Sequence, residues 1–252
     1  MTAAGRDRRL RWVTGSAVGL ALLFAGVATV ASARGGGADH TAAPAPRTPA
    51  MDSADAGFAR DMAIHHQQAV EMSFIVRDRT QNEEVRRLAY DIANTQANQR
   101  GMMLGWLDLW ELPKTAAGQE PMAWMTAGHE GHTSEDMDGM DGMDGMDGMD
   151  GMDGMAGMGS GYQAHDGSLM PGMATKTELR RLNGLSGRKA EILYLQLMTD
   201  HHKGGVDMAR GCARLCTVKV EKLLARGMVE AQQSELDMMA RMLAARGAKP
   251  RT

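Results

Sequence analysis

Two stretches of the chain decide its fold: "FARDMAIHHQQAVEM" at residues 58–72 and "YLQLMTDHHKGGVDM" at residues 194–208. Placing His65 over His201 aligns the two stretches without a gap, at an offset of 136 residues. The register continues along the chain, where the same offset pairs Gln96 with Gln232, Gln99 with Glu235, and Met103 with Met239. A register kept for about fifty residues indicates an internal duplication.

Each half predicts two amphipathic helices, because apolar side chains recur at steps of three and four residues. The first stripe is Phe58, Met62, His65, Ala69, Met72 and Val76, and its counterpart is Tyr194, Met198, His201, Gly205, Met208 and Cys212. The partner helices carry Ile92, Gln96, Gln99, Met103, Trp106 and Trp110, and Met228, Gln232, Glu235, Met239 and Met242. No stretch alternates at period two. We therefore predict an all-α protein, a four-helix bundle of two duplicated helix pairs.

After residue 33, the composition divides the chain into a linker and a bundle. Residues 34–51 are rich in Gly, Ala and Pro and form a linker, and residues 52–246 form the bundle. Within the bundle, the first half spans 52–112, a flexible Met-rich insertion spans 113–174, and the second half spans 175–246. The stretch "ATKTELRRLNGLSG" predicts a short additional helix with a Thr175–Glu178 capping box, ended by Gly184.

Residues 1–33 have the features of an export signal. Basic residues up to Arg11 precede an apolar run from Trp12 to Ala33, which ends in small residues. The run is also about long enough to cross a bilayer, which takes roughly 20 residues. A cleaved signal peptide and an uncleaved membrane anchor are both open. In either case we expect the rest of the chain outside the cytoplasm, secreted or anchored to the plasma membrane.

The charge of the chain excludes one class of partner. The formal net charge is −3, and residues 1–33 contribute +3 through four Arg and one Asp, which leaves −6 for the rest. No basic face for nucleic acid is present. The sequence also shows no Ser-His-Asp arrangement, phosphate loop or nucleotide motif, so hydrolase and kinase functions are disfavoured.

Polar residues on the inward stripes predict a metal site. A buried polar group without a partner costs about 1–3 kcal/mol, and here such groups recur at the same place in both halves. The alternative is that His and Gln satisfy each other across the bundle. The candidate ligands are Met62, His65, His66, Met72, Met198, His201, His202 and Met208, with Asp61, Gln99, Met103, Glu235 and Met239 as further candidates. Imidazole and thioether ligands favour copper, with Cu(I) first, although another transition metal is open.

Three features distinguish the halves, bear on the choice of metal or extend the site. Leu197 stands where the first half has Asp61, so the two sites need not have equal affinity. Glu235 is the only inward carboxylate that the stripes place, and a di-iron bundle needs several. Cys212 and Cys216 are four residues apart, which leaves open a packed core pair, a thiolate pair for Cu(I), or a disulfide that a regular helix would strain.

The insertion contains eight methionines at every third position: Met137, Met140, Met143, Met146, Met149, Met152, Met155 and Met158. Its glycines and aspartates cannot form a core, so we expect disorder. The tract is either a simple spacer or a flexible copper-binding segment, with His129 and His132 at its border adding imidazoles.

The paired "MAIHHQQAVEM" and "MTDHHKGGVDM" segments, together with "MPGMATKTELRRLNGLSG", resemble the family called domain of unknown function 305. The resemblance covers about residues 52–246 and implies a ferritin-like fold. Members of that family include an exported copper-binding protein, so the resemblance also implies copper binding by the paired His and Met residues of both halves. One departure is Lys203-Gly204-Gly205, where the family more usually has a Gly-Ala pair.

Three functions follow as hypotheses. The first is an exported or anchored protein that binds copper for sequestration, tolerance or delivery, with the metal ion as its partner. The second is a metal-dependent oxidase on the same bundle, which needs more carboxylate ligands than the sequence supplies. The third is an interaction scaffold without metal, in which the histidines serve stability alone. The first is favoured, and an enzyme is the less favoured assignment.

Overall fold

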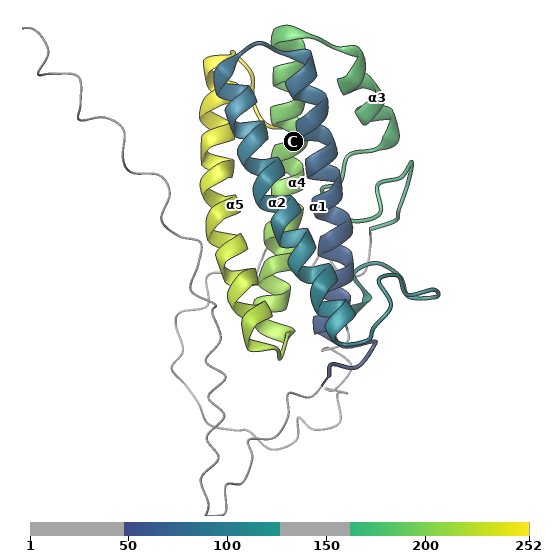
Figure 1. Cartoon of the computed structure of the whole chain (residues 1–252). Coiled ribbons are helices and arrows are strands. Elements are labelled where there is room, and N and C mark those ends of the chain that lie inside the picture. Colours follow the sequence, from purple (N-terminus) through teal and green to yellow (C-terminus); the bar gives the residue numbers. More distant parts are fainter. Residues whose placement is uncertain (1–47, 127–161, 252) are drawn as a thin grey trace, which may run out of the picture. The chain divides into compact units, whose positions relative to one another are not determined.

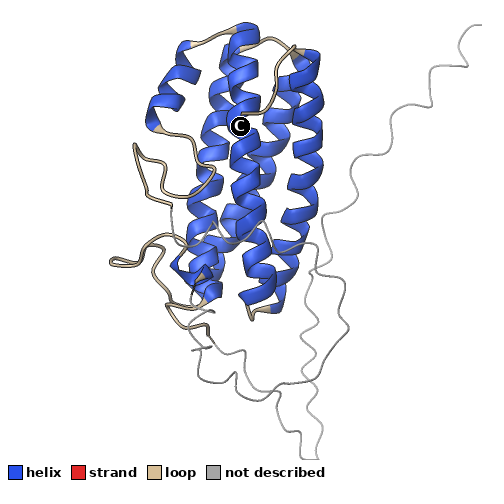
Figure 2. Ribbon diagram, turned by 180° about the vertical axis from the view of Figure 1, so that it is seen from behind, coloured by secondary structure: helices blue, strands red, loops and turns tan. Residues whose placement is uncertain are grey.

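The computed structural model describes residues 48–126 and 162–251. The long helices are α1 (Ala54–Arg79), α2 (Glu83–Leu109), α4 (Gly187–Leu215) and α5 (Lys219–Ala245), with the short helices η1 (Ala123–Met125) and α3 (Lys176–Gly184). The four long helices lie side by side, and helices that are neighbours in the bundle run in opposite directions (Figure 1). Within the described ranges no strand is present (Figure 2). The predicted all-α, ferritin-like four-helix bundle is confirmed.

Side-chain caps define the helix ends that the sequence indicates. Ser53 accepts a hydrogen bond from the Ala56 N–H at the start of α1, and Asn82 accepts one from Val85 at the start of α2. The Thr175–Glu178 capping box is present at the start of α3, as predicted. These bonds satisfy N–H groups that have no partner within their own helix.

Two hairpins make up the bundle. Residues 80–82 join α1 to α2, and residues 216–218 join α4 to α5. Helices α1 and α4 pack against each other and bring the two duplicated stripes together in the centre of the bundle. The first stripe is buried along its length, with no exposure of Phe58, Met62, His65, Ala69, Met72 or Val76. The heptad-like pattern therefore predicted the inward face of α1.

Both described ends of the segment 113–174 pack on the bundle. The Trp124 ring contacts Phe58 edge to face, with ring centroids 5.8 Å apart. A Cβ at Gly57 would clash with the same Trp124 ring, so glycine permits this close packing. At the other end Met170 is fully buried. Ordered structure thus extends further into this segment than its composition indicates.

Two predicted features lie outside the described residues: the apolar run at residues 12–33, and the tract at 137–158 with His129 and His132. Among the helices that the structure describes, none combines the length and apolarity needed to cross a membrane.

Candidate metal centre

Four histidines lie together between α1 and α4, midway along the bundle, and we call them the histidine layer: His65, His66, His201 and His202. All four are fully buried. The rings of His65 and His201 stack, with centroids 3.7 Å apart and planes inclined by 30°. His201 Nε2 also donates to the His65 carbonyl oxygen at 2.9 Å. The residues that the duplication aligns are therefore in direct contact.

The other two histidines are held by the outer helices in equivalent ways. His66 Nε2 bonds to Gln99 Oε1 of α2 at 2.8 Å, and His202 Nε2 bonds to Glu235 Oε2 of α5 at 2.7 Å. Adjacent helical residues differ by about 100° in direction, which is why His66 points to α2 while His65 faces α4. The two outer bonds differ in one respect: an amide oxygen accepts in the first half and a carboxylate oxygen in the second.

Several ring nitrogens of the histidine layer have no hydrogen-bond partner among the described residues. These are Nδ1 of His66, His201 and His202, and both ring nitrogens of His65. Since Nε2 of the first three rings lies against an oxygen acceptor, we assign the proton to Nε2, which leaves a lone pair on Nδ1. A buried nitrogen with a free lone pair is the donor that a metal ion requires.

Two glutamines add to the unpaired polar groups. Gln96 is buried, and neither atom of its side-chain amide has a partner within the described chain. Gln232 Oε1 is likewise unpaired, and it lies so close to Gly205 that a Cβ there would clash with it. The expectation that His and Gln satisfy each other across the bundle therefore holds only for His66 and Gln99.

Burial keeps His65, His66 and His201 neutral. Desolvation lowers the pKa of His65 and His201 well below the usual 6.5, and the neighbouring histidines lower it further. Desolvation also lowers the pKa of His66 to about 4, despite the hydrogen bond to Gln99. The carbonyl of Pro171 lies near His65 without the geometry of a hydrogen bond. These neutral rings bind metal ions without first losing a proton at neutral pH.

The stability of the metal-free protein should depend on the protonation of these rings. Since the pKa of His66 is lower in the folded protein than in the unfolded chain, the unfolded chain takes up the proton first as the pH falls. The free energy of unfolding should decrease between pH 6.5 and pH 4, by about 3 kcal/mol for His66 alone. Urea unfolding of chelator-treated protein across this range measures the decrease.

A matched pair of variants isolates the effect. His66→Leu should remove about that much of the pH dependence, because leucine does not titrate. His165→Gln alters an exposed histidine and should leave the dependence unchanged. A His66→Leu protein with the wild-type pH dependence would contradict the assignment of His66 as a neutral buried ring.

The predicted methionine ligands form two clusters. Met62, Met103 and Met208 belong to one buried core group, which we call the lower methionine cluster. Met72, Met198 and Met239 belong to the other, which we call the upper methionine cluster. On α1, Met62 lies about 4.5 Å before His65 along the helix axis and Met72 about 10 Å after it. Because α1 and α4 are antiparallel, the histidine layer lies between the two clusters.

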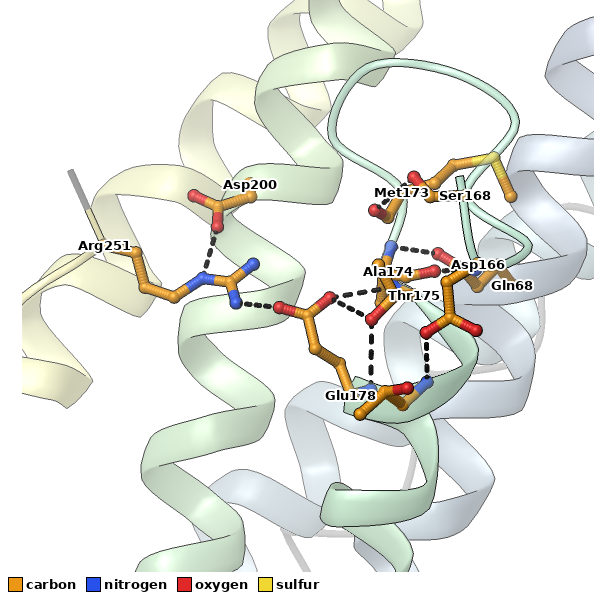
Figure 3. A network of polar contacts seen from close by, with 10 residues as sticks. Gln68, Asp166, Ser168, Met173, Ala174, Thr175, Glu178, Asp200 and Arg251 are labelled. Carbon is orange, nitrogen blue, oxygen red and sulfur yellow. Dashed lines mark hydrogen bonds and ion pairs between the residues drawn. The ribbon is translucent and has the colours of Figure 1, made fainter. Parts of the chain in front are cut away.

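The segment before α3 covers one side of the histidine layer. Gln68 of α1 holds this segment by two bonds to the backbone of Ala174, at 2.7 and 2.8 Å (Figure 3). A Cβ at Gly204 would clash with the carbonyl oxygen of Pro171. The unusual Gly204-Gly205 pair thus has two structural reasons: Gly204 admits this segment, and Gly205 admits Gln232.

The C-terminus fixes the same segment from the other side. Arg251 donates to Asp200 of α4 at 2.6 Å and forms an ion pair with Glu178 of α3. Glu178 in turn completes the capping box with Thr175 (Figure 3). One chain of bonds therefore links α4, the C-terminus and α3 beside the histidines.

Three further candidate ligands have other contacts. Asp61 Oδ2 accepts from the Met122 N–H at 2.7 Å and from Trp124 Nε1 at 2.9 Å, so Asp61 anchors the segment that contains η1. Cys212 and Cys216 form a disulfide. A regular helix would strain this bond, but α4 ends at Leu215, and Cys216 has an extended backbone.

The apolar stripes of the sequence did not predict the burial of three carboxylates. Asp55, Glu191 and Glu221 are 1, 7 and 0 % exposed, whereas the Glu235 side chain is 23 % exposed. Glu235 is therefore not the only inward carboxylate. Asp55 and Glu191 occupy equivalent positions in the duplication, ten residues before His65 and His201, and Glu221 lies in the first turn of α5. All three lie near helix ends, beyond the apolar stripes, so the stripes did not indicate them.

Several solved structures are similar to this chain. A protein of Streptomyces coelicolor, described as a "putative secreted protein DUF305", is 55% identical with a TM-score of 0.63, and the match covers 81% of this chain and 99% of that one. A DUF305 fragment from Deinococcus radiodurans is 24% identical, with a TM-score of 0.52 and coverage of 76% and 96%. CopM in its Cu(I)-bound form is 17% identical, with a TM-score of 0.49 and coverage of 76% and 96%. No curated protein matches the sequence.

The family model gives the assignment. The model of the domain of unknown function DUF305 matches residues 55–243, which include all four long helices almost completely and the whole histidine layer. With the duplicated histidine pairs and the highly identical DUF305 structure, this places the sequence within one family. The chain belongs to the DUF305 family.

Proposed function

We propose that the protein is an exported copper-binding protein that holds Cu(I) between its histidine layer and its methionine clusters, for sequestration, tolerance or delivery. The observation that carries the proposal is the set of buried, unpaired imidazole nitrogens. Neutral imidazole and thioether together favour Cu(I), whereas zinc is seldom bound by a thioether. The export-type N-terminus and the 55% identical relative described as secreted support a location outside the cytoplasm.

The duplication supports two equivalent copper positions, one toward each methionine cluster. In the lower position the nearest thioether along the helix is Met62, and in the upper position it is Met198. The carboxylate of Glu235 behind His202 makes that ring a more basic ligand than the Gln99 amide makes His66. We therefore expect the half that contains His202 to bind copper more tightly.

A di-iron oxidase is less well supported by the same residues. The buried carboxylates Asp55 and Glu191 are ten residues from the histidines on their helices, about 15 Å along the axis. Glu191 is also paired with Thr80 and Arg246, at 2.6 and 2.8 Å. Carboxylates at the ends of the bundle do not join the histidines around one metal pair.

A Cu(I) titration against a competing chelator, without oxygen, tests the proposal. It compares residues 34–252 with a version that lacks residues 136–159. The shortened protein should keep up to two tightly bound Cu(I) ions, which excess Zn²⁺ does not displace, and the longer protein should bind additional, weaker Cu(I). A shortened protein that binds no Cu(I) would contradict the bundle site and leave the Met tract as the only copper-binding segment.

A further inference from the structure

A second group of metal-binding side chain types lies where α4 ends and α5 begins. Cys212 is in the last turn of α4, Cys216 is its C-cap, and Glu221 is in the first turn of α5. The two sulfur atoms and one carboxylate oxygen of Glu221 all lie within 4.8 Å of one another. All three residues are buried. This corner is about 15 Å along α4 from the histidine layer, ten residues away.

The duplication shows which residues this corner needs for packing alone. At the offset of 136, the other half of the protein builds the equivalent corner from Val76, Thr80 and Val85. Val76 and Val85 are fully buried, and Thr80 is the C-cap of α1 as Cys216 is of α4. A helix hairpin of this shape therefore forms without cysteine, and with valine at the position of Glu221. The three chemically reactive residues occur in only one of the two equivalent corners.

The surroundings of Glu221 favour a cation. Neither carboxyl oxygen of Glu221 has a hydrogen-bond donor within the described chain. The neighbouring Asp55 accepts the N–H groups of Thr217 and Val218, at 2.8 and 2.7 Å, and so caps α5. Desolvation, together with Asp55, raises the pKa of Glu221 to about 10. Two buried carboxyl groups side by side cannot both ionise at low cost without a positive charge.

We propose that Cys212, Cys216 and Glu221 form a redox-controlled zinc site, which binds Zn²⁺ when the disulfide is reduced and releases it when the disulfide forms. Thiolate and carboxylate are both ordinary ligands of Zn²⁺, whereas a disulfide sulfur is not. The divalent charge would allow Glu221 to ionise beside Asp55. The site is independent of the proposed copper positions and shares no ligand with them.

The chemistry balances with a dithiol as reductant. The dithiol transfers two electrons and two protons to the Cys212–Cys216 disulfide, and it becomes a disulfide itself. Zn²⁺ then displaces the two thiol protons and the proton of Glu221, so three protons leave as one ion binds. A disulfide as oxidant reverses the sequence: the ion leaves as the two thiols and Glu221 regain their protons, and the oxidant takes two electrons and two protons from the cysteines and becomes a dithiol. Because Cys216 lies outside the helix, its sulfur can separate from Cys212 without unwinding α4.

Zinc binding by the full chain in two redox states tests the proposal. Oxidised protein and protein reduced with a water-soluble phosphine are titrated with Zn²⁺ against a chromophoric chelator, without oxygen. Reduced protein should bind one more Zn²⁺ per chain than oxidised protein. Co²⁺ in place of Zn²⁺ should give a thiolate-to-metal charge-transfer absorption in the reduced protein alone.

Three variants separate ligand loss from misfolding. Glu221→Gln keeps both thiols and should weaken the additional zinc site at least about tenfold. The triple variant Cys212→Val, Cys216→Thr, Glu221→Val copies the equivalent corner of the first half, so it should fold and should lack the additional site completely. Glu230→Gln, on the exposed face of α5, should leave zinc binding unchanged.

Several outcomes would overturn the proposal. They are equal zinc binding in both redox states, no charge-transfer absorption with Co²⁺, or a disulfide that the phosphine cannot reduce in the folded protein. The copper sites are measured on oxidised protein, so their failure and the failure of the zinc site are distinguishable.

Discussion

Replacing His65 and His201 together with leucine should lower the Cu(I) affinity of the bundle at least about 100-fold. Even residues that only orient a metal ligand contribute 10–100-fold to affinity, and here two ligand rings are removed. The metal-free protein should be at least as stable as wild type. Both rings are fully buried, and neither nitrogen of His65 has a partner among the described residues, so leucine relieves about 1–3 kcal/mol of unpaired burial. Chelator competition and urea unfolding measure the two effects.

A control variant distinguishes a ligand from a core residue. Tyr194→Phe removes the bond between the Tyr194 hydroxyl and Ser73 Oγ, 3.1 Å long, in the same buried stripe. It should lower the free energy of unfolding by about 1 kcal/mol and leave copper binding unchanged. If the leucine variant instead loses several kcal/mol and keeps its copper, the histidines are structural residues and the copper proposal is wrong.

The position of the histidine layer was predictable because the duplication and the helical period both place the histidines on the inward faces of equivalent helices. A stripe that repeats at steps of three and four buries one face. The copy at an offset of 136 indicates that His65 and His201 occupy equivalent places. Two equivalent helices that pack in antiparallel directions bring equivalent midpoints together, which the ring stacking of 3.7 Å reflects.

The hydrogen bonds of the outer histidines were less predictable. The apolar stripes predict Gln99 and Glu235 on the inward face, but both residues are only half-buried. Each reaches a histidine from the edge of the bundle. Whether a side chain lies at the centre or at the edge of the bundle depends on how α2 and α5 are rotated about their axes. A sequence period defines that rotation only to within about one residue.

The corner around Glu221 could not be predicted from periodicity. Its members come from the start of α1, the end of α4 and the start of α5, and Asp55 is 162 residues from the Thr217 that it binds. The apolar stripes at steps of three and four residues also do not extend to the helix ends. A signal was nevertheless present: Glu221 aligns with Val85 at the offset of 136. A charged residue aligned with an apolar one in an otherwise regular duplication marks a position where the halves have diverged in chemistry.

Both sites share one physical property, which is that they weaken the metal-free fold. The histidine layer keeps several polar nitrogens buried without partners, and the corner keeps a carboxyl group neutral beside another carboxylate. Residues that destabilise the ligand-free protein are expected at sites where ligand binding restores the lost stability. The equivalent corner with Val76, Thr80 and Val85 has no such group, so the fold itself does not require one.

Glu221→Gln should therefore stabilise the oxidised, metal-free protein. In the folded protein the pKa of Glu221 is raised to about 10, against 4.5 for the free side chain, so its contribution to stability is present below pH 4.5 and is lost as the pH rises toward 10. At pH 7 this loss is about 3 kcal/mol. Glutamine is neutral at every pH and its amide can donate to Asp55, so the variant should gain about that amount. Urea unfolding at pH 5, 7 and 8 should show the advantage growing with pH, while Glu230→Gln shows none. A Glu221→Gln protein less stable than wild type at pH 8 would mean that Glu221 is ionised in the fold, and that a positive group already compensates it.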